Sequence, residues 1–149
     1  MKIKIITIGK TREEYLKKGI SDYLKRVCFY CHVEWIEIVL PTNSKSIRQR
    51  IKKLKKDLHG HFVVAMDEKG AEYTSREFAG FIEKMMVSGK EQITFILGGH
   101  NGLELELLNS ADMTISLSRL TFTHQMVRLI FIEQLYRAFT IIKGEAYHH

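Results

Sequence analysis

Apolar and polar residues follow two different patterns along this chain, one typical of strands and one typical of helices. Short runs rich in Ile, Val and Phe, residues that β-strands favour, cover residues 2–9, 32–40, 61–66, 91–97 and 113–117. The segments between them have helical spacing of apolar residues or begin at a capping residue, so helices are expected over residues 12–26, 45–58, 75–87, 103–108 and 124–142. This alternation predicts an α/β fold, with a mostly parallel sheet that helices cover on both faces.

The length and composition fit one folded unit. The chain has 149 residues, of which 45% are hydrophobic and 27% charged, and no repeat or long linker divides it, so residues 1–149 are expected to form a single domain. The first residues do not resemble a signal peptide, and no run reaches the roughly 20 apolar residues of a membrane span. Two cysteines provide no disulfide framework. We therefore expect a cytoplasmic protein without a membrane partner.

Three loops are the places where a ligand is expected. In parallel sheets, ligands bind at the carboxyl ends of the strands, which directs attention to the segments after residues 66, 97 and 117. Residues 67–70 are expected to form a turn, and residues 98–102 (GGHNG) a glycine loop. The glycine spacing fits neither a dinucleotide fingerprint nor a P-loop. A binding loop and a plain tight turn both remain compatible with it.

The segment 124–142 is apolar on nearly all sides. A surface helix in a domain of this size shows one apolar stripe, whereas this one carries apolar residues almost all the way around. One face would then contact the domain core and another a partner subunit, which predicts a homodimer, the commonest closed assembly. The alternative is a helix fully buried in the core of one chain.

The charge of the chain favours an anionic partner. The formal net charge is +6, and seven Lys or Arg residues lie in the predicted helix 45–58. Lys52, Lys53 and Lys56 of this helix are candidates for contact with an RNA backbone. The alternative is a solvated helix face, the usual meaning of a run of like charges.

Two further motifs carry candidate chemistry. Cys28 and Cys31 form a C-x-x-C pair, but zinc needs two more ligands and no second pair exists, so no metal site is expected. Glu133 and Arg137 lie four residues apart, which fits either an intrahelical ion pair or polar groups at a substrate pocket. The chain ends in Tyr-His-His, either a frayed terminus or a source of acid, base or hydrogen-bonding groups.

Four segments taken in order resemble one bacterial family over essentially the whole chain. They are LGGHNG at residues 97–102, LSRLTFTHQMVR at 117–128, EQLYRA at 133–138 and GEAYH at 144–148. This combination is similar to that of the ribosomal RNA large-subunit methyltransferase H family, in the SPOUT superfamily. The resemblance implies a C-terminal trefoil knot, a dimer, and methylation by S-adenosylmethionine of N3 of a pseudouridine in 23S ribosomal RNA.

The resemblance also implies which residues form the site. The implied cofactor-binding residues are Met66, Gly98, Leu117, Ser118, Arg119, Leu120, Thr121 and Phe122. On the substrate side it implies His124, Arg137, Tyr147 and His148, with the C-terminal tail reaching the other subunit's cofactor. As a mechanism, His148 or Tyr147 orients the base or accepts its proton, and Arg137 or Arg128 stabilises the negative charge that develops on the uracil carbonyls. Arg128 is also a candidate RNA contact.

Two hypotheses follow about function. The first is an S-adenosylmethionine-dependent ribosomal RNA methyltransferase. Because one small domain offers little surface to select a single nucleotide, the assembled ribosome is its expected substrate. The second is a non-enzymatic RNA-binding module that acts through the basic helix 45–58. It predicts binding to ribosomes without affinity for the cofactor.

Overall fold

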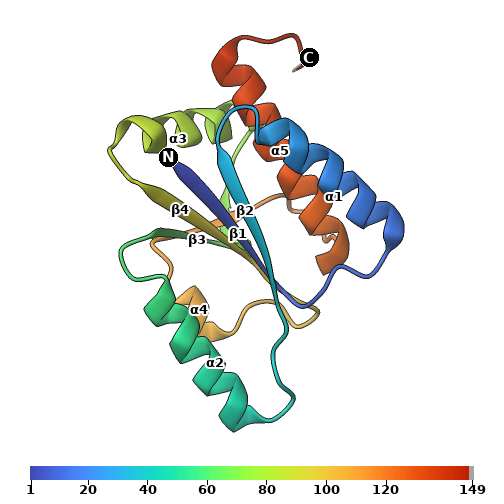
Figure 1. The fold of residues 1–149 in the computed structure, drawn as a ribbon, viewed down its shortest axis with the longest axis vertical. Helices are drawn as coiled ribbons and strands as arrows, with labels where there is room; N and C mark the ends of the chain where they lie inside the picture. Colours follow the sequence, from blue (N-terminus) through green and yellow to red (C-terminus); the bar gives the residue numbers. More distant parts are fainter. Residues whose placement is uncertain (148–149) are drawn as a thin grey trace.

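Five parallel strands form a single sheet at the centre of the molecule. The computed structural model describes residues 1–147, and its sheet has the order β2-β1-β4-β3-β5 (Figure 1). The strands are β1 (Lys2–Ile8), β2 (His32–Ile38), β3 (Phe62–Glu72), β4 (Gln92–Leu97) and β5 (Met113–Ser116). All four neighbouring pairs are parallel, which confirms the predicted sheet.

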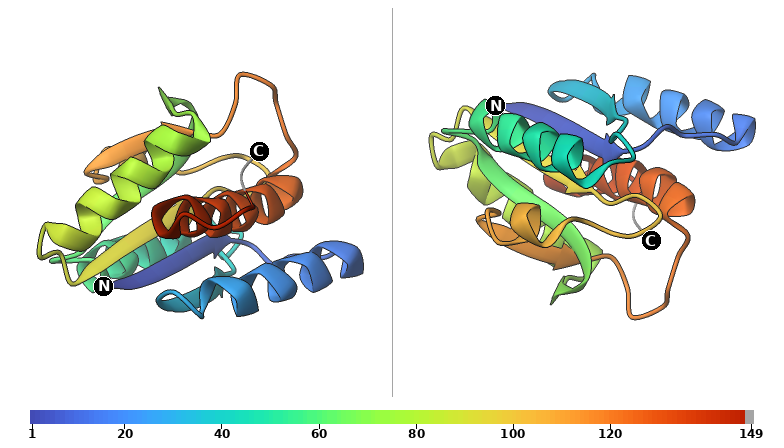
Figure 2. Two further views of the ribbon diagram at one scale, coloured as in Figure 1. Left: turned by 90° about the horizontal axis from the view of Figure 1, so that it is seen from above. Right: turned by 90° about the horizontal axis from the view of Figure 1, so that it is seen from below.

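Helices cover both faces of this sheet, as the sequence predicts. On one face lie α1 (Glu14–Val27), α3 (Ser75–Val87) and α5 (His124–Lys143), and on the other α2 (Ser44–Asp57) and α4 (Leu105–Leu108). Figure 2 shows α5 between α1 and α3, so it covers the middle of its face. No helix within residues 1–147 is both long and apolar enough to cross a membrane.

The alternation of side chains along each strand produces two separate cores. In β1, Ile3 and Ile5 belong to the core under α1, α3 and α5, whereas Ile6 and Ile8 belong to the core under α2 and α4. Successive side chains of a strand point to opposite faces, and a strand buried on both faces must be apolar at nearly every position. This requirement explains the unbroken apolar runs of the central strands.

The structure corrects one predicted boundary. Residues 67–70, predicted as a turn that ends the third strand, instead lie within β3. Met66 and Ala71 both pair with Ile115, so the four residues between them bulge out of the pairing with β5. A Cβ on Gly70 would lie 2.6 Å from the backbone of Ile115. Glycine is therefore needed where the bent strand passes so close to β5.

The last helix is defined by clear signals at both ends. Thr123 caps its first turn, with its hydroxyl accepting a hydrogen bond from the amide of Met126, and Gly144 ends it with a φ of 68°. The helix starts at the carboxyl ends of the strands and runs toward their amino ends (Figure 1). It therefore extends along the strands from their carboxyl ends to their amino ends. The trefoil knot that the resemblance implies stays a prediction.

Candidate functional site

A cavity of about 560 Å³ lies at the carboxyl ends of β4 and β5, beside the residues where β3 leaves its pairing with β5. We call it the β3–β5 cavity. Its volume falls within the range of roughly 300–1,000 Å³ that small-molecule sites occupy. The loops after β4 and β5 and residues 66–69 of β3 line it. These are the three segments to which the sequence directs attention for a ligand.

The glycine loop forms one wall of the cavity as a tight turn. Gly99 and Gly102 exchange two backbone hydrogen bonds, of 3.2 and 3.0 Å, and Gly102 has a φ of 76°. A Cβ on Gly98 would lie 2.6 Å from the carbonyl carbon of Gly102, so only glycine fits there without moving the backbone. The tight turn and the binding loop, which the sequence left as alternatives, are thus compatible with each other.

The loop after β5 forms the opposite wall and is held by serine side chains. The hydroxyl of Ser116 donates to the carbonyl of Ser118 at 3.1 Å, and the hydroxyl of Ser118 accepts from the amide of Leu120 at 2.9 Å. Leu120 and Phe122 line the cavity yet are 74% and 36% exposed. The cavity therefore has an open, apolar rim, on which a flat ring could pack.

Seven of the eight residues expected to bind a cofactor line the cavity. They are Met66, Gly98, Leu117, Ser118, Leu120, Thr121 and Phe122. The eighth, Arg119, is absent from the lining, and its guanidinium lies 3.9 Å from Glu72 with the side chain 89% exposed. Sequence reasoning singled out neither Asp67 nor Glu68, which also line the cavity. The rule about strand ends does point to their segment, residues 67–70, although not to these two side chains.

A second cluster of polar groups lies around Glu133, toward the far end of α5. The Nε and Nη2 atoms of Arg137 donate to one carboxylate oxygen of Glu133 at 3.1 and 2.8 Å. The phenol of Tyr147 donates to the same oxygen at 3.1 Å and lies 3.2 Å from the hydroxyl of Tyr23. The guanidinium of Arg137 also lies over the ring of Tyr147, 4.8 Å from its centre. The ion pair expected from the sequence is therefore one part of a larger network.

The tail is held against α1 by the same network. Burial raises the pKa of Tyr147, and its hydrogen bonds with Tyr23 and Glu133 raise this pKa further. Tyr30 donates to Glu145 at 2.6 Å, and this hydrogen bond raises the pKa of Tyr30 to about 12. Both phenols thus stay protonated near neutral pH, and in this arrangement Tyr147 is a hydrogen-bond donor. His148 lies outside the described residues.

The two groups of candidate residues do not meet within one chain. Val127 lines the β3–β5 cavity, and a helical rise of ~1.5 Å per residue puts Arg137 about 15 Å further along α5. Arg137 and Tyr147 are accordingly absent from the cavity lining. A single chain brings together the cofactor half of the predicted site but not the catalytic half.

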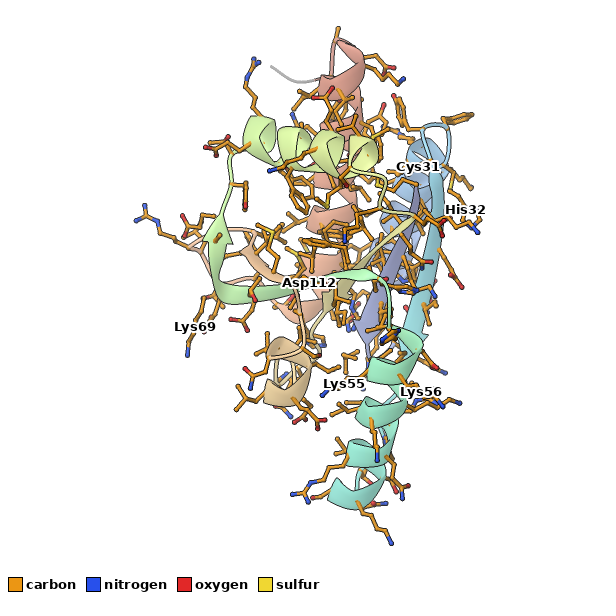
Figure 3. The ribbon with its side chains drawn as sticks, turned by 90° about the vertical axis from the view of Figure 1, so that its left-hand side faces the viewer. Cys31, His32, Lys55, Lys56, Lys69 and Asp112 are labelled. Atoms are coloured by element: carbon orange, nitrogen blue, oxygen red, sulfur yellow. The ribbon has the colours of Figure 1, made fainter. Side chains whose placement is uncertain are left out.

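The candidate RNA contacts fall into three different environments. Lys52, Lys53 and Lys56 are exposed on α2. The neighbouring Lys55 lies on the side of this helix that faces α4 (Figure 3), and its ammonium lies 3.1 Å from Glu106 of α4. His124 lines the β3–β5 cavity, with its ring 5.7 Å from that of His100. Burial lowers the pKa of His124, and the positive charge of Arg128 lowers it further.

Arg128 has a different environment from the one predicted. Its side chain is completely buried, and its guanidinium donates to the carbonyl of Ile8 at 2.9 Å and to the hydroxyl of Thr11 at 3.0 Å. Both acceptors lie at or just after the end of β1, so this arginine connects α5 to β1 and to the loop that follows it. The geometry does not favour the predicted direct contact of Arg128 with RNA.

The C-x-x-C pair lies in no group of three or more His, Cys, Asp or Glu side chains that could hold a metal ion among residues 1–147. Cys28 is exposed and Cys31 half-buried, and both are free thiols. Burial raises the pKa of Cys31 to about 12. A thiol that stays protonated is a poor nucleophile and a poor metal ligand.

Comparison with known proteins gives full-length matches. A family model described as a predicted SPOUT methyltransferase matches residues 1–148. A protein of Acetivibrio thermocellus named ribosomal RNA large subunit methyltransferase H is 45% identical, over 99% of each chain. A protein of the same name from Cytophaga hutchinsonii is 44% identical, over the full length of both chains.

Two solved structures share the fold at low sequence identity. A probable methylase family protein from Haemophilus influenzae superposes with a TM-score of 0.60 and 13% identity, covering 99% of this chain and 70% of the other. A probable methyltransferase from Bordetella pertussis has a TM-score of 0.59 and 9% identity, covering 91% of this chain and 93% of the other. These likenesses concern the arrangement of strands and helices.

Proposed function

Because the chain belongs to the SPOUT methyltransferase family, as a member of the ribosomal RNA large subunit methyltransferase H group, we propose that it methylates large-subunit ribosomal RNA with S-adenosylmethionine. The observation that carries this proposal is the β3–β5 cavity. It is built from seven of the eight residues that the resemblance assigns to the cofactor. The proposed substrate also implies that the protein acts in the cytoplasm.

The residues of the cavity fit the chemistry of S-adenosylmethionine. Leu117, Leu120 and Phe122 provide apolar surface for an adenine ring, and the backbone at Gly98 can approach a ligand because no side chain intervenes. Asp67 and Glu68 bring two carboxylates to the same cavity and Lys69 one ammonium group, so the acidic side chains outnumber the lysine and favour a ligand that carries positive charge. When bound, S-adenosylmethionine supplies an electrophilic methyl group, so no metal ion is needed.

The protein's own residues have two tasks in this reaction. The first is to hold a pseudouridine against the cavity and exclude water. The second is to manage the proton of the imide nitrogen N3, which is a poor nucleophile while protonated. Arg137 is placed by Glu133 and would stabilise the negative charge that develops on the uracil carbonyls. Tyr147, which stays protonated, would orient the base as a hydrogen-bond donor, and His148 would orient the base or accept its proton.

We further propose that the active site is shared between two chains. Met126, Ile130, Ile141 and Ile142 of α5 remain half-buried in one chain, and Phe122 and Leu120 stay exposed beside them in sequence. Two chains related by a two-fold axis could cover this apolar surface. If their α5 helices pack in antiparallel fashion, Arg137 and Tyr147 of one chain approach the β3–β5 cavity of the other. Such a homodimer joins the two halves of the site.

The family match also decides between the two hypotheses drawn from the sequence. A non-enzymatic RNA-binding module has no need for the β3–β5 cavity, whereas a methyltransferase requires such a site. The exposed lysines of α2 serve RNA contact equally well in an enzyme. We therefore retain the basic helix as a part of the substrate surface.

The test combines cofactor binding with identification of the product. We expect calorimetry to show micromolar binding of S-adenosylmethionine, and mass spectrometry to locate one added methyl group at N3 of a pseudouridine in 23S ribosomal RNA. Ribosomes, isolated large subunits and free RNA are compared as substrates, with ribosomes expected to react fastest. Methylation at a different atom or base would correct the proposed position. A protein that binds ribosomes but neither binds the cofactor nor transfers methyl would restore the binding-module hypothesis.

A further inference from the structure

A second cavity, of about 420 Å³, adjoins the first across the glycine loop. Its walls are the segments after β1 and β2, the glycine loop and the beginning of α5. It shares residues 99–102 and His124 with the β3–β5 cavity. A ligand that occupies both cavities would pass directly over the glycine loop.

The charges around this second cavity are mainly positive, so we call it the basic cavity. Lys10, Arg12 and Arg128 line it, against a single carboxylate in the lining, that of Glu104. Lys10 and Arg12 are exposed and form no salt bridge with any residue between 1 and 147. Their charges are available to an incoming anion.

The backbone beneath these side chains is firmly held. Gln125 accepts a hydrogen bond from the amide of Arg12 at 2.9 Å and donates to the carbonyl of Lys10 at 3.0 Å. Arg128 binds Ile8 and Thr11 from below, and its Nε finds no hydrogen-bond partner in the described part of the chain. A rigid loop that presents two cations loses little entropy when it binds a ligand.

The start of α5 adds further positive potential. Its first turn lines the basic cavity through His124 and Gln125, and the N-terminus of a 20-residue helix carries partial positive charge. The lowered pKa of His124, caused by burial and then by Arg128, His100 and Arg12, agrees with such a potential. Carboxylates outside the lining are those of Glu37, which accepts from the amide of Thr11 at 3.0 Å, and of the exposed Glu13 and Glu14, which follow Arg12 in the chain.

The positive surface also continues toward the basic helix. A third hollow, which includes Arg50 and Lys53 of α2, shares residues 39–41 with the basic cavity. Cationic side chains therefore extend from α2 through the basic cavity to the edge of the β3–β5 cavity. A nucleic-acid strand, with its regularly spaced phosphates, matches this extended arrangement better than a single small anion does.

We propose that the basic cavity binds the RNA phosphate next to the methylated nucleotide, with Lys10 and Arg12 as its direct contacts. This inference rests on the proposed function, because it takes the β3–β5 cavity as the cofactor site. The glycine loop then lies between the bound phosphate on one side and the cofactor on the other. Arg128 acts as a positioning residue that holds the loop from beneath. Neither exposed residue was a candidate from the sequence, since a lone basic residue after a strand carries no recognisable signal.

The test compares two double variants of the full-length protein that remove the same charges. Lys10→Gln/Arg12→Gln removes the proposed contacts, and Arg76→Gln/Lys84→Gln removes two exposed basic residues of α3 as the control. A labelled short single-stranded RNA is titrated over a range of salt concentrations. Each phosphate contact contributes ~0.7 to the salt slope of single-strand binding, so the first variant should lose about 1.4 of slope and on the order of 25-fold in affinity near 0.1 M salt. The control should bind like the unmodified protein.

Three outcomes would overturn the inference. One is equal RNA affinity and slope in both variants. Another is a comparable loss of S-adenosylmethionine affinity in the Lys10/Arg12 variant, which would assign the cavity to the cofactor's carboxylate. The third is that millimolar RNA leaves the imidazole NMR resonances of His100 and His124 unchanged. Failure of the proposed function looks different, because RNA would then bind through Lys10 and Arg12 while cofactor affinity and methyl transfer are absent from the unmodified protein.

Discussion

Arg128 shows how much one residue depends on its surroundings. In the sequence it is a basic residue near the start of a helix, and the charge of the chain makes it a reasonable candidate for RNA contact. In the structure its side chain is completely buried and satisfies acceptors at Ile8 and Thr11. No local pattern reports this, because the acceptors lie more than 100 residues away in the chain. Burial of a cation is tolerated only where hydrogen bonds compensate for lost hydration.

The stability of the protein should therefore depend on Arg128. We expect Arg128→Met to lower the free energy of unfolding by about 2 kcal/mol, because the buried carbonyl of Ile8 loses its donor. Arg119→Met is the control, since its side chain is 89% exposed and should change stability by less than ~0.5 kcal/mol. Urea unfolding at one protein concentration measures both. Equal stability of the two variants would contradict the structural role of Arg128.

At the scale of elements, apolar periodicity predicted the five strands and five helices. The main wrong boundary lies where a strand is irregular. The third strand was expected to end at residue 66 because Asp-Glu-Lys-Gly has the composition of a turn. Those residues do leave the ladder, but pairing resumes at Ala71 and Glu72 opposite β5. Whether a chain returns to its sheet depends on a partner strand, here β5, which a local pattern does not contain.

Two glycines in different elements allow a matched prediction. A Cβ on Gly98 would meet the backbone of Gly102 at 2.6 Å, whereas nothing lies within 4 Å of one on Gly80, in the exposed middle of α3. Gly98→Ala should therefore distort the cavity wall and weaken S-adenosylmethionine binding by about tenfold or more. Gly80→Ala should leave binding unchanged and raise stability by about 0.5–1 kcal/mol, because alanine favours helix. Calorimetry and thermal unfolding separate these effects, and tight cofactor binding by Gly98→Ala would count against the proposed site.

At the scale of the whole molecule, the sequence predicted the cofactor half of the site better than the catalytic half. The rule that ligands bind at strand ends pointed to segments that line the β3–β5 cavity, and the family resemblance supplied seven of its lining residues. The positions of Arg137 and Tyr147 relative to that cavity depend on how two chains associate. The sequence of one chain indicates that α5 is apolar on several sides. It does not indicate where a partner helix crosses α5.

Subunit complementation tests the shared site directly. Gly98→Val should disable the cofactor half and Arg137→Met the catalytic half, so that each variant homodimer is inactive. A heterodimer that contains one chain of each kind has one site with both halves intact and one with neither. We expect such heterodimers, purified through two different tags, to show about half of the unmodified activity. If each site lay within one chain, both chains of the heterodimer would be defective and no activity would return.

The place of α5 in the chain also has a consequence for the protein's synthesis. This helix covers the middle of an apolar sheet face that includes Phe95, yet its 20 residues are translated only after all five strands. At roughly 5–20 residues per second, their addition takes on the order of 1–4 s. During that time the nascent chain carries an uncovered hydrophobic surface, which chaperones recognise. A message truncated before codon 124 would leave this surface exposed permanently, and its product should be degraded rather than accumulate as a smaller folded protein.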